Sequence, residues 1–224
     1  MSMRVERPGV RDGYDRWAET YDATPNPVVS LDRRYALRAL DARRGEAVLD
    51  AGCGTGSHLG RLCALGARPV GLDFSPAMLR VARRKAPDAG LARADLDKGW
   101  PIRAGAFDAV LSSLVSEHLT NLGGFFREVF ASLRRGGRLV FSAFHPDPAR
   151  AGVEANFARA GVEYRLGAER YTVDEYLTRI AEAGFERLRC REYSGDDGLL
   201  GEIPQAAKYL GRPLLLLVCA ERAA

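Results

Sequence analysis

Three glycines at alternate positions, Gly52, Gly54 and Gly56, follow a short apolar run that ends in Asp50. Glycine lets the backbone turn sharply and leaves no Cβ between the turn and a ligand. The free N–H groups at the start of a following helix attract a polar or anionic group. The segment therefore predicts a ligand-binding turn between a buried strand and a helix.

A second acidic residue, Asp73, ends another apolar run about twenty residues further on, the spacing seen in nucleotide-binding folds. A carboxylate at this point can accept hydrogen bonds from both hydroxyls of a ribose. The glycine turn and Asp73 together predict a cofactor that contains adenosine. A tight turn that binds no ligand is the alternative, and the presence of Asp73 at this distance disfavours it.

The spacing of the glycines separates two classes of cofactor. Dinucleotide-binding turns usually read G-x-G-x-x-G and hold a pyrophosphate at the helix start, whereas this turn reads G-x-G-x-G after Asp50. An acidic group at the strand end would repel a pyrophosphate but suits a cationic amino-acid portion. An NAD-dependent oxidoreductase is therefore the less favoured alternative among enzymes.

The segment from Asp50 to Gly56 resembles the first motif of class I S-adenosylmethionine (SAM)-dependent methyltransferases. It is closest to the small-molecule group that includes the ubiquinone and menaquinone methyltransferases. The resemblance implies an α/β fold with a Rossmann-like, mainly parallel sheet of seven strands in the order 3-2-1-4-5-7-6 and helices on both faces. It also implies methyl transfer from SAM to a small-molecule acceptor. A SAM-binding protein without activity is the alternative outside enzymes.

The resemblance extends to residues that follow the second and third expected strands. Met78 stands where a side chain of this family often lies against the adenine, although a core methionine is an equal reading. Asp95 resembles the acceptor for the adenine amine, and the N–H of Leu96 would face the ring. The cofactor-binding residues implied by the resemblance are Tyr21, Asp50, Gly52, Gly54, Gly56, Asp73, Phe74, Met78, Asp95, Leu96 and Ser112.

Two histidines are candidates for a general base. Displacement at an activated methyl group needs mainly alignment, which can contribute roughly 7–11 kcal/mol, and a base only if the acceptor must lose a proton. His118 and His145 follow the fourth and fifth expected strands, where open α/β sheets bind ligands. We slightly favour His145, because the resemblance puts the acceptor side after the fifth strand. The alternative is that neither histidine acts as a base.

Alternating strand and helix patterns must position these residues in a parallel sheet with helices on both faces. Helices are expected over 57–65 and 122–135, and a third begins at the capping box of Thr172 and Glu175 and ends at Ala183. Residues 194–212 read as irregular. The expected strands are 47–50, 68–73, 90–94, 106–112, 138–144, 185–193 and 213–221.

Two segments lie outside the expected sheet. Residues 1–30 form an N-terminal cap whose aromatic side chains, Tyr14, Trp17 and Tyr21, resemble a helix that closes over the cofactor in this methyltransferase group. An aromatic anchor for an N-terminal helix is the other reading. Residues 145–170 form an insertion that the resemblance assigns to substrate covering, and loops of such length are often functional. Both belong to one domain that spans 1–224.

Composition restricts the remaining classes. The chain of 224 residues has a net charge of +4, no apolar run of 18 residues, and no basic stripe interleaved with aromatic residues. These features predict one domain without a membrane span or a nucleic-acid partner. Its four cysteines are scattered, which disfavours a metal site and disulfides and fits the reducing cytoplasm. The acceptor and the oligomeric state stay open, a homodimer included.

Overall fold

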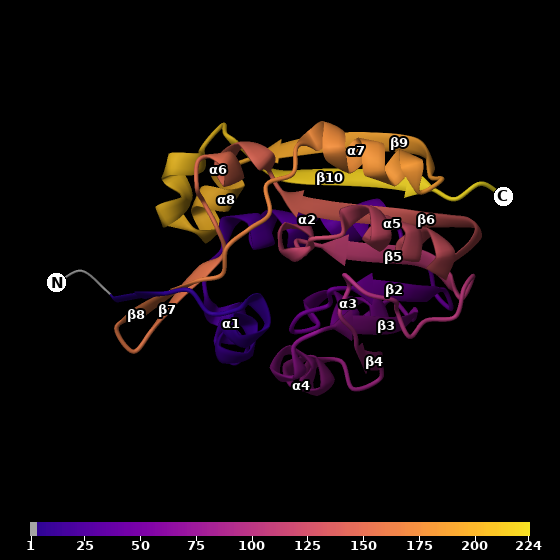
Figure 1. The fold of residues 1–224 in the computed structure, drawn as a ribbon, viewed down its shortest axis with the longest axis horizontal. Helices are drawn as coiled ribbons and strands as arrows, with labels where there is room; N and C mark the ends of the chain where they lie inside the picture. Colours follow the sequence, from indigo (N-terminus) through magenta and orange to yellow (C-terminus); the bar gives the residue numbers. More distant parts are fainter. Residues whose placement is uncertain (1–3) are drawn as a thin grey trace.

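A seven-stranded sheet forms the centre of the protein in the computed structural model, which describes residues 4–224 (Figure 1). The strand order is β4-β3-β2-β5-β6-β10-β9, and β10 runs antiparallel to both of its neighbours. Numbered within this sheet alone, the order is 3-2-1-4-5-7-6, so the predicted topology is confirmed. The strands are β2 (Ala47–Ala51), β3 (Arg68–Asp73), β4 (Gly90–Arg93), β5 (Phe107–Ser113), β6 (Leu133–Phe144), β9 (Glu186–Ser194) and β10 (Pro213–Glu221).

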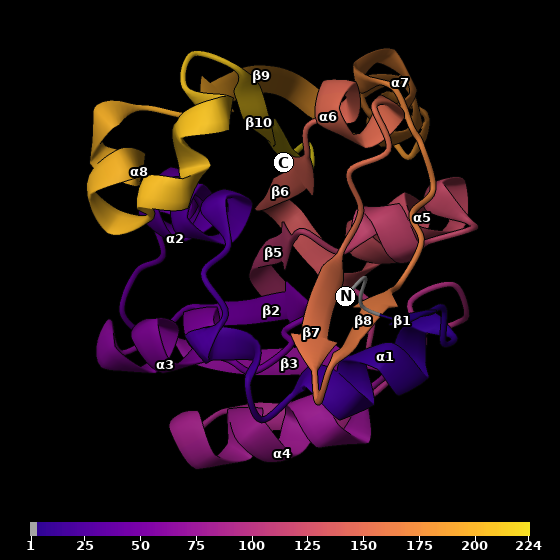
Figure 2. The same ribbon diagram turned by 90° about the vertical axis from the view of Figure 1, so that its left-hand side faces the viewer.

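Helices cover both faces of the sheet, as expected for a parallel α/β fold. One face carries α5 (Leu122–Ser132) and α7 (Val173–Glu182), and the other carries α2 (Pro27–Leu40), α3 (Ser57–Ala64) and α8 (Asp197–Glu202) (Figure 2). The apolar residues Leu122, Phe125, Phe126 and Val129 of α5 are buried in the core, and Phe130 is partly buried. The run from Leu214 to Val218 in β10 is buried on both sides, since a central strand contacts helices on both faces.

Local sequence signals set most helix ends. Ser75 caps α4 (Pro76–Lys85) by accepting a hydrogen bond from the N–H of Met78, and α7 begins with the predicted capping box. Helix α5 ends three residues before the predicted residue 135. Leu133 is already extended there, because it pairs with Phe107 of β5.

Helix α2 was not predicted from the sequence, although it starts with recognisable signals. Asn26 caps it by accepting hydrogen bonds from the N–H groups of Val28 and Val29, and Pro27 occupies its first turn. Its apolar face packs against β2, β5, β6 and β10. The cap expected over 1–30 therefore continues into a helix that covers the sheet, and residues 1–3 lie outside the described chain.

The segment 145–170 is more regular than expected. It contains α6 (Pro146–Arg150) and a hairpin of β7 (Asn156–Arg159) and β8 (Val162–Arg165). Strand β8 pairs in parallel with β1 (Arg4–Glu6), which makes a small second sheet. Figure 1 shows this sheet standing away from the main sheet, beside α1 (Val10–Trp17). The N-terminal cap and the insertion are therefore joined by backbone hydrogen bonds.

Aromatic contacts also tie the cap to the insertion. Trp17 of α1 stacks on Phe157 of the hairpin, with ring centroids 4.8 Å apart. Tyr21 follows in the short helix η1 (Tyr21–Ala23) and meets Trp17 edge-on at 4.9 Å. The predicted irregular stretch 194–212 contains α8 and the short helix η3 (Pro204–Tyr209). Across residues 4–224, every helix is too short or too polar to cross a membrane.

Candidate active site

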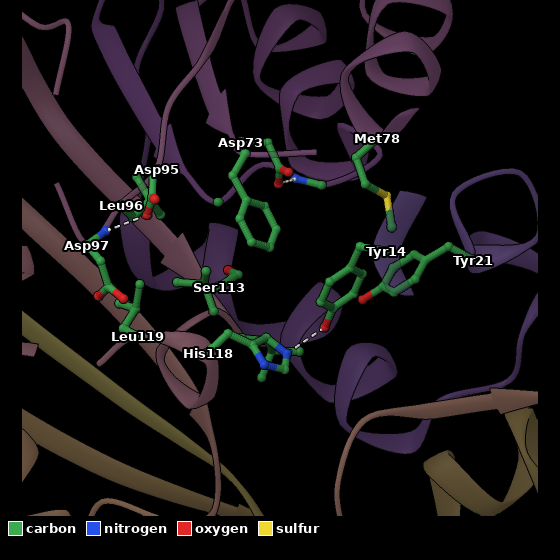
Figure 3. Close-up of a pocket in the computed structure, with 15 residues that line it drawn as sticks. Tyr14, Tyr21, Asp73, Met78, Asp95, Leu96, Asp97, Ser113, His118 and Leu119 are labelled. Carbon is green, nitrogen blue, oxygen red and sulfur yellow. Dashed lines mark hydrogen bonds between the residues drawn. The ribbon is translucent and has the colours of Figure 1, made fainter. Parts of the chain in front are cut away.

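The carboxyl ends of β2, β3 and β5 meet α1 around a cavity, which Figure 3 shows from within. We call it the cofactor cavity. It brings together most of the residues predicted to bind the cofactor, namely Tyr21, Gly52, Gly54, Asp73, Phe74, Met78, Asp95 and Leu96. Tyr14, expected in the segment that closes over the cofactor, and His118, a candidate base, also line it. The cavity further contains residues without a predicted role, namely Asp97, Ser113, Leu114, Val115 and Leu119.

Asp73 links the glycine turn to the start of α4. One of its carboxylate oxygens accepts a hydrogen bond of 2.9 Å from the N–H of Gly54 (Figure 3). The other accepts one from the N–H of Ser75, also at 2.9 Å. Burial raises the pKa of Asp73 to about 6, against the lowering effect of these two bonds. Each oxygen keeps a further lone pair, so the carboxylate can also accept hydroxyl groups from the cavity.

The three glycines of the turn have different roles. All have positive φ, with values of 88° for Gly52, 52° for Gly54 and 76° for Gly56. A Cβ on Gly54 would meet no atom within 4 Å, so this position leaves room for a ligand. A Cβ on Gly56 would lie 3.0 Å from the Cα of Ala82, and Gly56 is outside the cavity lining. Gly56 therefore allows α3 to pack against α4, and the geometry does not support its predicted contact with the cofactor.

One end of the cavity has the groups needed to hold a flat heterocycle. Asp95 and Leu96 lie there (Figure 3). The ring of Phe74 also lines the cavity. Asp95 is held by Lys98 at 2.8 Å, and this contact lowers the pKa of the Asp95 carboxyl. Met78 is 2% exposed and packs in a cluster with Ala18, Tyr14 and Tyr21 while also lining the cavity. Both readings of Met78, a core side chain and a cavity wall, are therefore true.

A smaller cavity adjoins this one at the glycine turn, since both are lined by Gly52 and Gly54, and Asp50 lines the smaller one. Asp50 is 1% exposed, and neither of its carboxylate oxygens accepts a hydrogen bond from the described residues. Burial, with Asp32 and Asp73 nearby, raises the pKa of Asp50 to about 7, and His58 opposes the rise. A buried carboxylate without a partner is costly. The arrangement therefore suits a ligand that brings a cation to Asp50.

Arg33 of α2 lines the same small cavity, and the sequence reading missed it. Its guanidinium donates to Asp22 at 2.9 Å, which joins η1 to α2. Because α2 was not predicted, no sequence pattern indicated that Arg33 lies near the glycine turn. Asp32 also lines the cavity but is paired with His58 at 2.7 Å. The unpaired carboxylate of Asp50 and the guanidinium of Arg33 would complement an amino acid in its zwitterionic form.

His118 forms a hydrogen-bonded pair with Tyr14. The Tyr14 hydroxyl lies 2.8 Å from Nε2 of His118, and donates to it when that nitrogen carries no hydrogen (Figure 3). Burial lowers the pKa of His118, so the imidazole is neutral near pH 7, and burial raises the pKa of Tyr14. His118 belongs to the short helix η2 (Ser116–His118), which follows β5. The pair can therefore take up a proton at the edge of the cofactor cavity.

Two predicted residues lie elsewhere. His145 is 3% exposed and caps α6, where its Nδ1 accepts from the N–H of Asp147 at 3.2 Å, and it lines neither the cofactor cavity nor its neighbours. The geometry therefore favours His118 over His145 and reverses the preference drawn from the sequence. Ser112 is fully buried and donates to the carbonyl of Ala51, so the lining residue of β5 is Ser113.

A second cavity, of about 310 Å³, opens beside the first between the cap and the insertion. We call it the acceptor cavity. It shares Tyr14, Tyr21 and Leu114 with the cofactor cavity, so the two spaces meet at these residues. Leu114 has the unusual φ of 53°, a backbone strain of the kind that clusters at functional sites.

Known proteins agree with this geometry. The family described as "Methyltransferase domain" matches residues 49–141. The demethylmenaquinone methyltransferase of Tropheryma whipplei (strain Twist) is 35% identical over 144 residues, which are 61% of this chain and 60% of that protein. This chain thus spans about three fifths of that relative. The malonyl-[acyl-carrier protein] O-methyltransferase of Pseudescherichia vulneris is 30% identical over 182 residues, 80% of this chain and 69% of that protein.

A solved structure extends the comparison to the fold. The crystal structure of the S-adenosylmethionine-dependent methyltransferase from Mesorhizobium loti has a TM-score of 0.71 and 30% identity, covering 85% of this chain and 97% of that chain. The chain therefore belongs to the family of SAM-dependent methyltransferases. The predicted family and its cofactor, SAM, are confirmed.

Proposed function

We propose that the protein transfers a methyl group from SAM to a small-molecule acceptor and leaves S-adenosylhomocysteine. The observation that carries this proposal is the buried, unpartnered carboxylate of Asp50 beside a glycine turn that also bonds Asp73. A ligand with a ribose and a cationic amino-acid end would satisfy both carboxylates, whereas a pyrophosphate would bring negative charge to Asp50. When bound, SAM supplies a methyl group that its sulfonium charge has already activated.

The chain's own residues fit the parts of this cofactor. Asp73 would accept the ribose hydroxyls, and Asp50 would hold the amino-acid ammonium. Arg33 would bind the amino-acid carboxylate in exchange for Asp22, its present partner. The backbone at Gly54 would lie against the ligand, since no side chain fills that space. Asp95 and Leu96 would hold the adenine.

The His118–Tyr14 pair is the proposed proton acceptor. Tyr14 lines both cavities and hydrogen-bonds His118, whose lowered pKa leaves it neutral and able to accept a proton. An acceptor that must lose a proton would give it to Tyr14 as Tyr14 gives its own to His118. Most of the acceleration would come from alignment of the acceptor with the methyl group.

The cap and the insertion are proposed to cover the acceptor within a single domain. Side chains of both segments, Tyr14, Trp17 and Tyr21 from the cap and Ala155 and Phe157 from the insertion, line the acceptor cavity. Their enclosure of a space of about 310 Å³ supports a small molecule over a nucleic acid. All four cysteines are free thiols, which supports a reducing compartment, and we propose the cytoplasm.

Calorimetric titration tests the cofactor assignment. S-adenosylhomocysteine is expected to bind and to raise the melting temperature, while NAD gives neither effect. The Asp50→Asn variant should bind S-adenosylhomocysteine more weakly, and the matched control Asp88→Asn, at an exposed position, should not. Tighter binding of NAD than of S-adenosylhomocysteine would overturn the proposal. Mass spectrometry of a metabolite extract incubated with methyl-labelled SAM would then identify the acceptor.

A further inference from the structure

We propose that the acceptor is a small organic amine with an apolar or aromatic body, whose nitrogen is held by Glu117 and methylated. This inference rests on the proposed function and deepens it, since it names the class of acceptor and a residue that recognises it. Three features of the acceptor cavity carry it: the absence of basic side chains from its lining, one uncompensated carboxylate, and a group of aromatic rings.

The lining of the acceptor cavity contains no arginine, lysine or histidine among the described residues. This is notable in a chain whose 33 basic residues outnumber its 29 acidic ones. An acceptor that carries a carboxylate or a phosphate would find no cation to pair with inside the cavity. The cavity therefore favours a neutral or positively charged molecule.

Two carboxylates line the cavity, and only one of them is compensated. Glu154 forms an ion pair with Arg7 at 3.1 Å. Glu117 has no ion pair with any described residue, and its Oε2 is buried and accepts no hydrogen bond. Leaving a buried carboxylate oxygen unpaired is costly. Glu117 is half-buried, and it thus offers the cavity a carboxylate that no described residue neutralises.

The backbone holds Glu117 in place. It lies in the middle of η2, and its carbonyl accepts a hydrogen bond of 2.7 Å from the N–H of Glu169, on the segment before α7. The turn is therefore anchored from two sides. The position of the Glu117 backbone at the cavity is therefore set before a ligand binds.

Aromatic rings form the wall beside the junction of the two cavities. Tyr14 stacks on Trp17 with centroids 6.0 Å apart, and Trp17 meets Tyr21 edge-on. Aromatic faces attract ammonium groups through their quadrupoles. A hydroxyl acceptor would satisfy the hydrogen bond of Glu117 but leave its charge uncompensated. An ammonium group donates the hydrogen bond to Glu117 and compensates its charge, and the aromatic rings attract it as well.

The amine would lie next to the groups that handle the proton. Glu117 precedes His118 in the chain, and Tyr14 borders both cavities. The ammonium loses one proton through the Tyr14 hydroxyl to Nε2 of His118, which releases it to solvent. The nitrogen lone pair then forms the new N–C bond, and the electron pair of the broken C–S bond stays on sulfur. The products are a methylated ammonium and S-adenosylhomocysteine.

Binding of three probes with one skeleton tests the inference without a variant. We would titrate 2-phenylethylamine, 2-phenylethanol and 3-phenylpropionate into the protein saturated with S-adenosylhomocysteine. The amine is expected to bind at least about 10-fold more tightly than the alcohol, the lower end of what a hydrogen bond to a charged group gives. The carboxylate is expected not to bind. Equal binding of amine and alcohol, or tighter binding of the carboxylate, would overturn the inference.

A matched pair of variants tests the role of Glu117. Glu117→Gln keeps the backbone contact with Glu169 and should lower the affinity for the amine about 10- to 150-fold. Glu169→Gln makes the same change of charge at an exposed position and should leave the amine affinity unchanged. Unchanged amine affinity in Glu117→Gln would refute the proposal. Binding of S-adenosylhomocysteine distinguishes the proposed function from this inference. If S-adenosylhomocysteine does not bind, the proposed function is contradicted. If it binds and the amine does not, only this inference is contradicted.

Discussion

Asp73 is the residue on which the proposed cofactor site most depends. Charge-assisted hydrogen bonds contribute about 1.5–3 kcal/mol each. We therefore expect Asp73→Ala to lower the affinity for S-adenosylhomocysteine about 10- to 150-fold. The same change removes the bonds to the N–H groups of Gly54 and Ser75, so the melting temperature should also fall. Calorimetric titration and thermal unfolding would measure the two effects. An unchanged dissociation constant would show that the ribose is held by other residues.

Asp50 should make cofactor binding depend on pH. Its pKa of about 7 lies above that of an unfolded aspartate, about 3.9, because of burial first and of Asp32 and Asp73 next, with His58 opposing. The ammonium of the ligand pairs only with the ionised carboxylate. We therefore expect the affinity for S-adenosylhomocysteine to rise about 10-fold from pH 6 to pH 8, which follows from the fraction ionised at a pKa of about 7.

The same raised pKa of Asp50 makes the stability of the ligand-free protein decrease as pH rises, whereas the affinity for ligand increases. A carboxyl whose pKa is raised on folding stabilises the fold below the unfolded pKa, and this contribution is lost as pH rises through the folded pKa. The melting temperature without ligand should thus fall between pH 5 and pH 8, while the increase caused by S-adenosylhomocysteine grows. Asp50→Asn should flatten both trends. A pH-independent affinity in the parent protein would contradict the role given to Asp50.

The two histidines should respond differently to substitution. His118→Ala is expected to lower turnover of an acceptor that must lose a proton by about 10²–10⁴, with little change in SAM affinity. Tyr14→Phe should lower turnover in the same way, since it removes the hydroxyl that connects the cavity to His118. His145→Ala serves as the control, because His145 caps α6 away from both cavities. Near-normal turnover in His118→Ala would mean that alignment alone suffices.

Among the elements, α1 and the β7–β8 hairpin should be the most affected by ligand. They enclose the acceptor cavity and contact each other through Trp17 and Phe157, so they must separate to admit an acceptor. We expect amide exchange in residues 10–23 and 153–166 to be faster than in the sheet without ligand and to slow when S-adenosylhomocysteine binds. Exchange that is equally slow with and without ligand would argue against an opening motion.

The seven strands of the main sheet were predictable because their signals are local. Most are short apolar runs between turn residues, although the edge strand β9 is largely charged and exposed, and the order follows from the family resemblance. The β7–β8 hairpin was not predictable, since its two-residue turn, Ala160 and Gly161, has positive φ at both positions without the usual Asn-Gly signal. Its partner β1 lies some 150 residues away in the chain, so the pairing leaves no local pattern.

The site shows the same limit. The glycine turn, Asp73 and Asp95 were found because they belong to short motifs. Ser112 was chosen where Ser113 lines the cavity, since adjacent strand residues point to opposite faces and a motif does not fix which one faces the ligand. The contact between Tyr14 and His118 spans 104 residues, and Arg33 lies on an unpredicted helix. Only the folded chain brings these groups together.

At the scale of the whole molecule, we expect one cooperative unfolding transition. Ala36, Leu37 and Leu40 of α2 share a cluster with core residues of β2, β5, β6 and β10, so the N-terminal segment is part of the main core. Scanning calorimetry should show a single peak that S-adenosylhomocysteine moves as a unit. A separate low-temperature transition would mean that the cap folds independently of the sheet.

The pairing of β1 with β8 has a consequence for how this protein could change over time. Residues 49–141, which the family shares, supply the glycine turn, Asp73 and the adenine end. Most of the acceptor cavity is built from chain outside that range, with Leu114 and Glu117 as the residues contributed from within it. The protein could therefore change its acceptor while the residues of 49–141 that line the cofactor cavity are inherited unchanged. Because β1 and β8 hold each other in register, the N-terminal cap and the insertion must be inherited or exchanged as a matched pair.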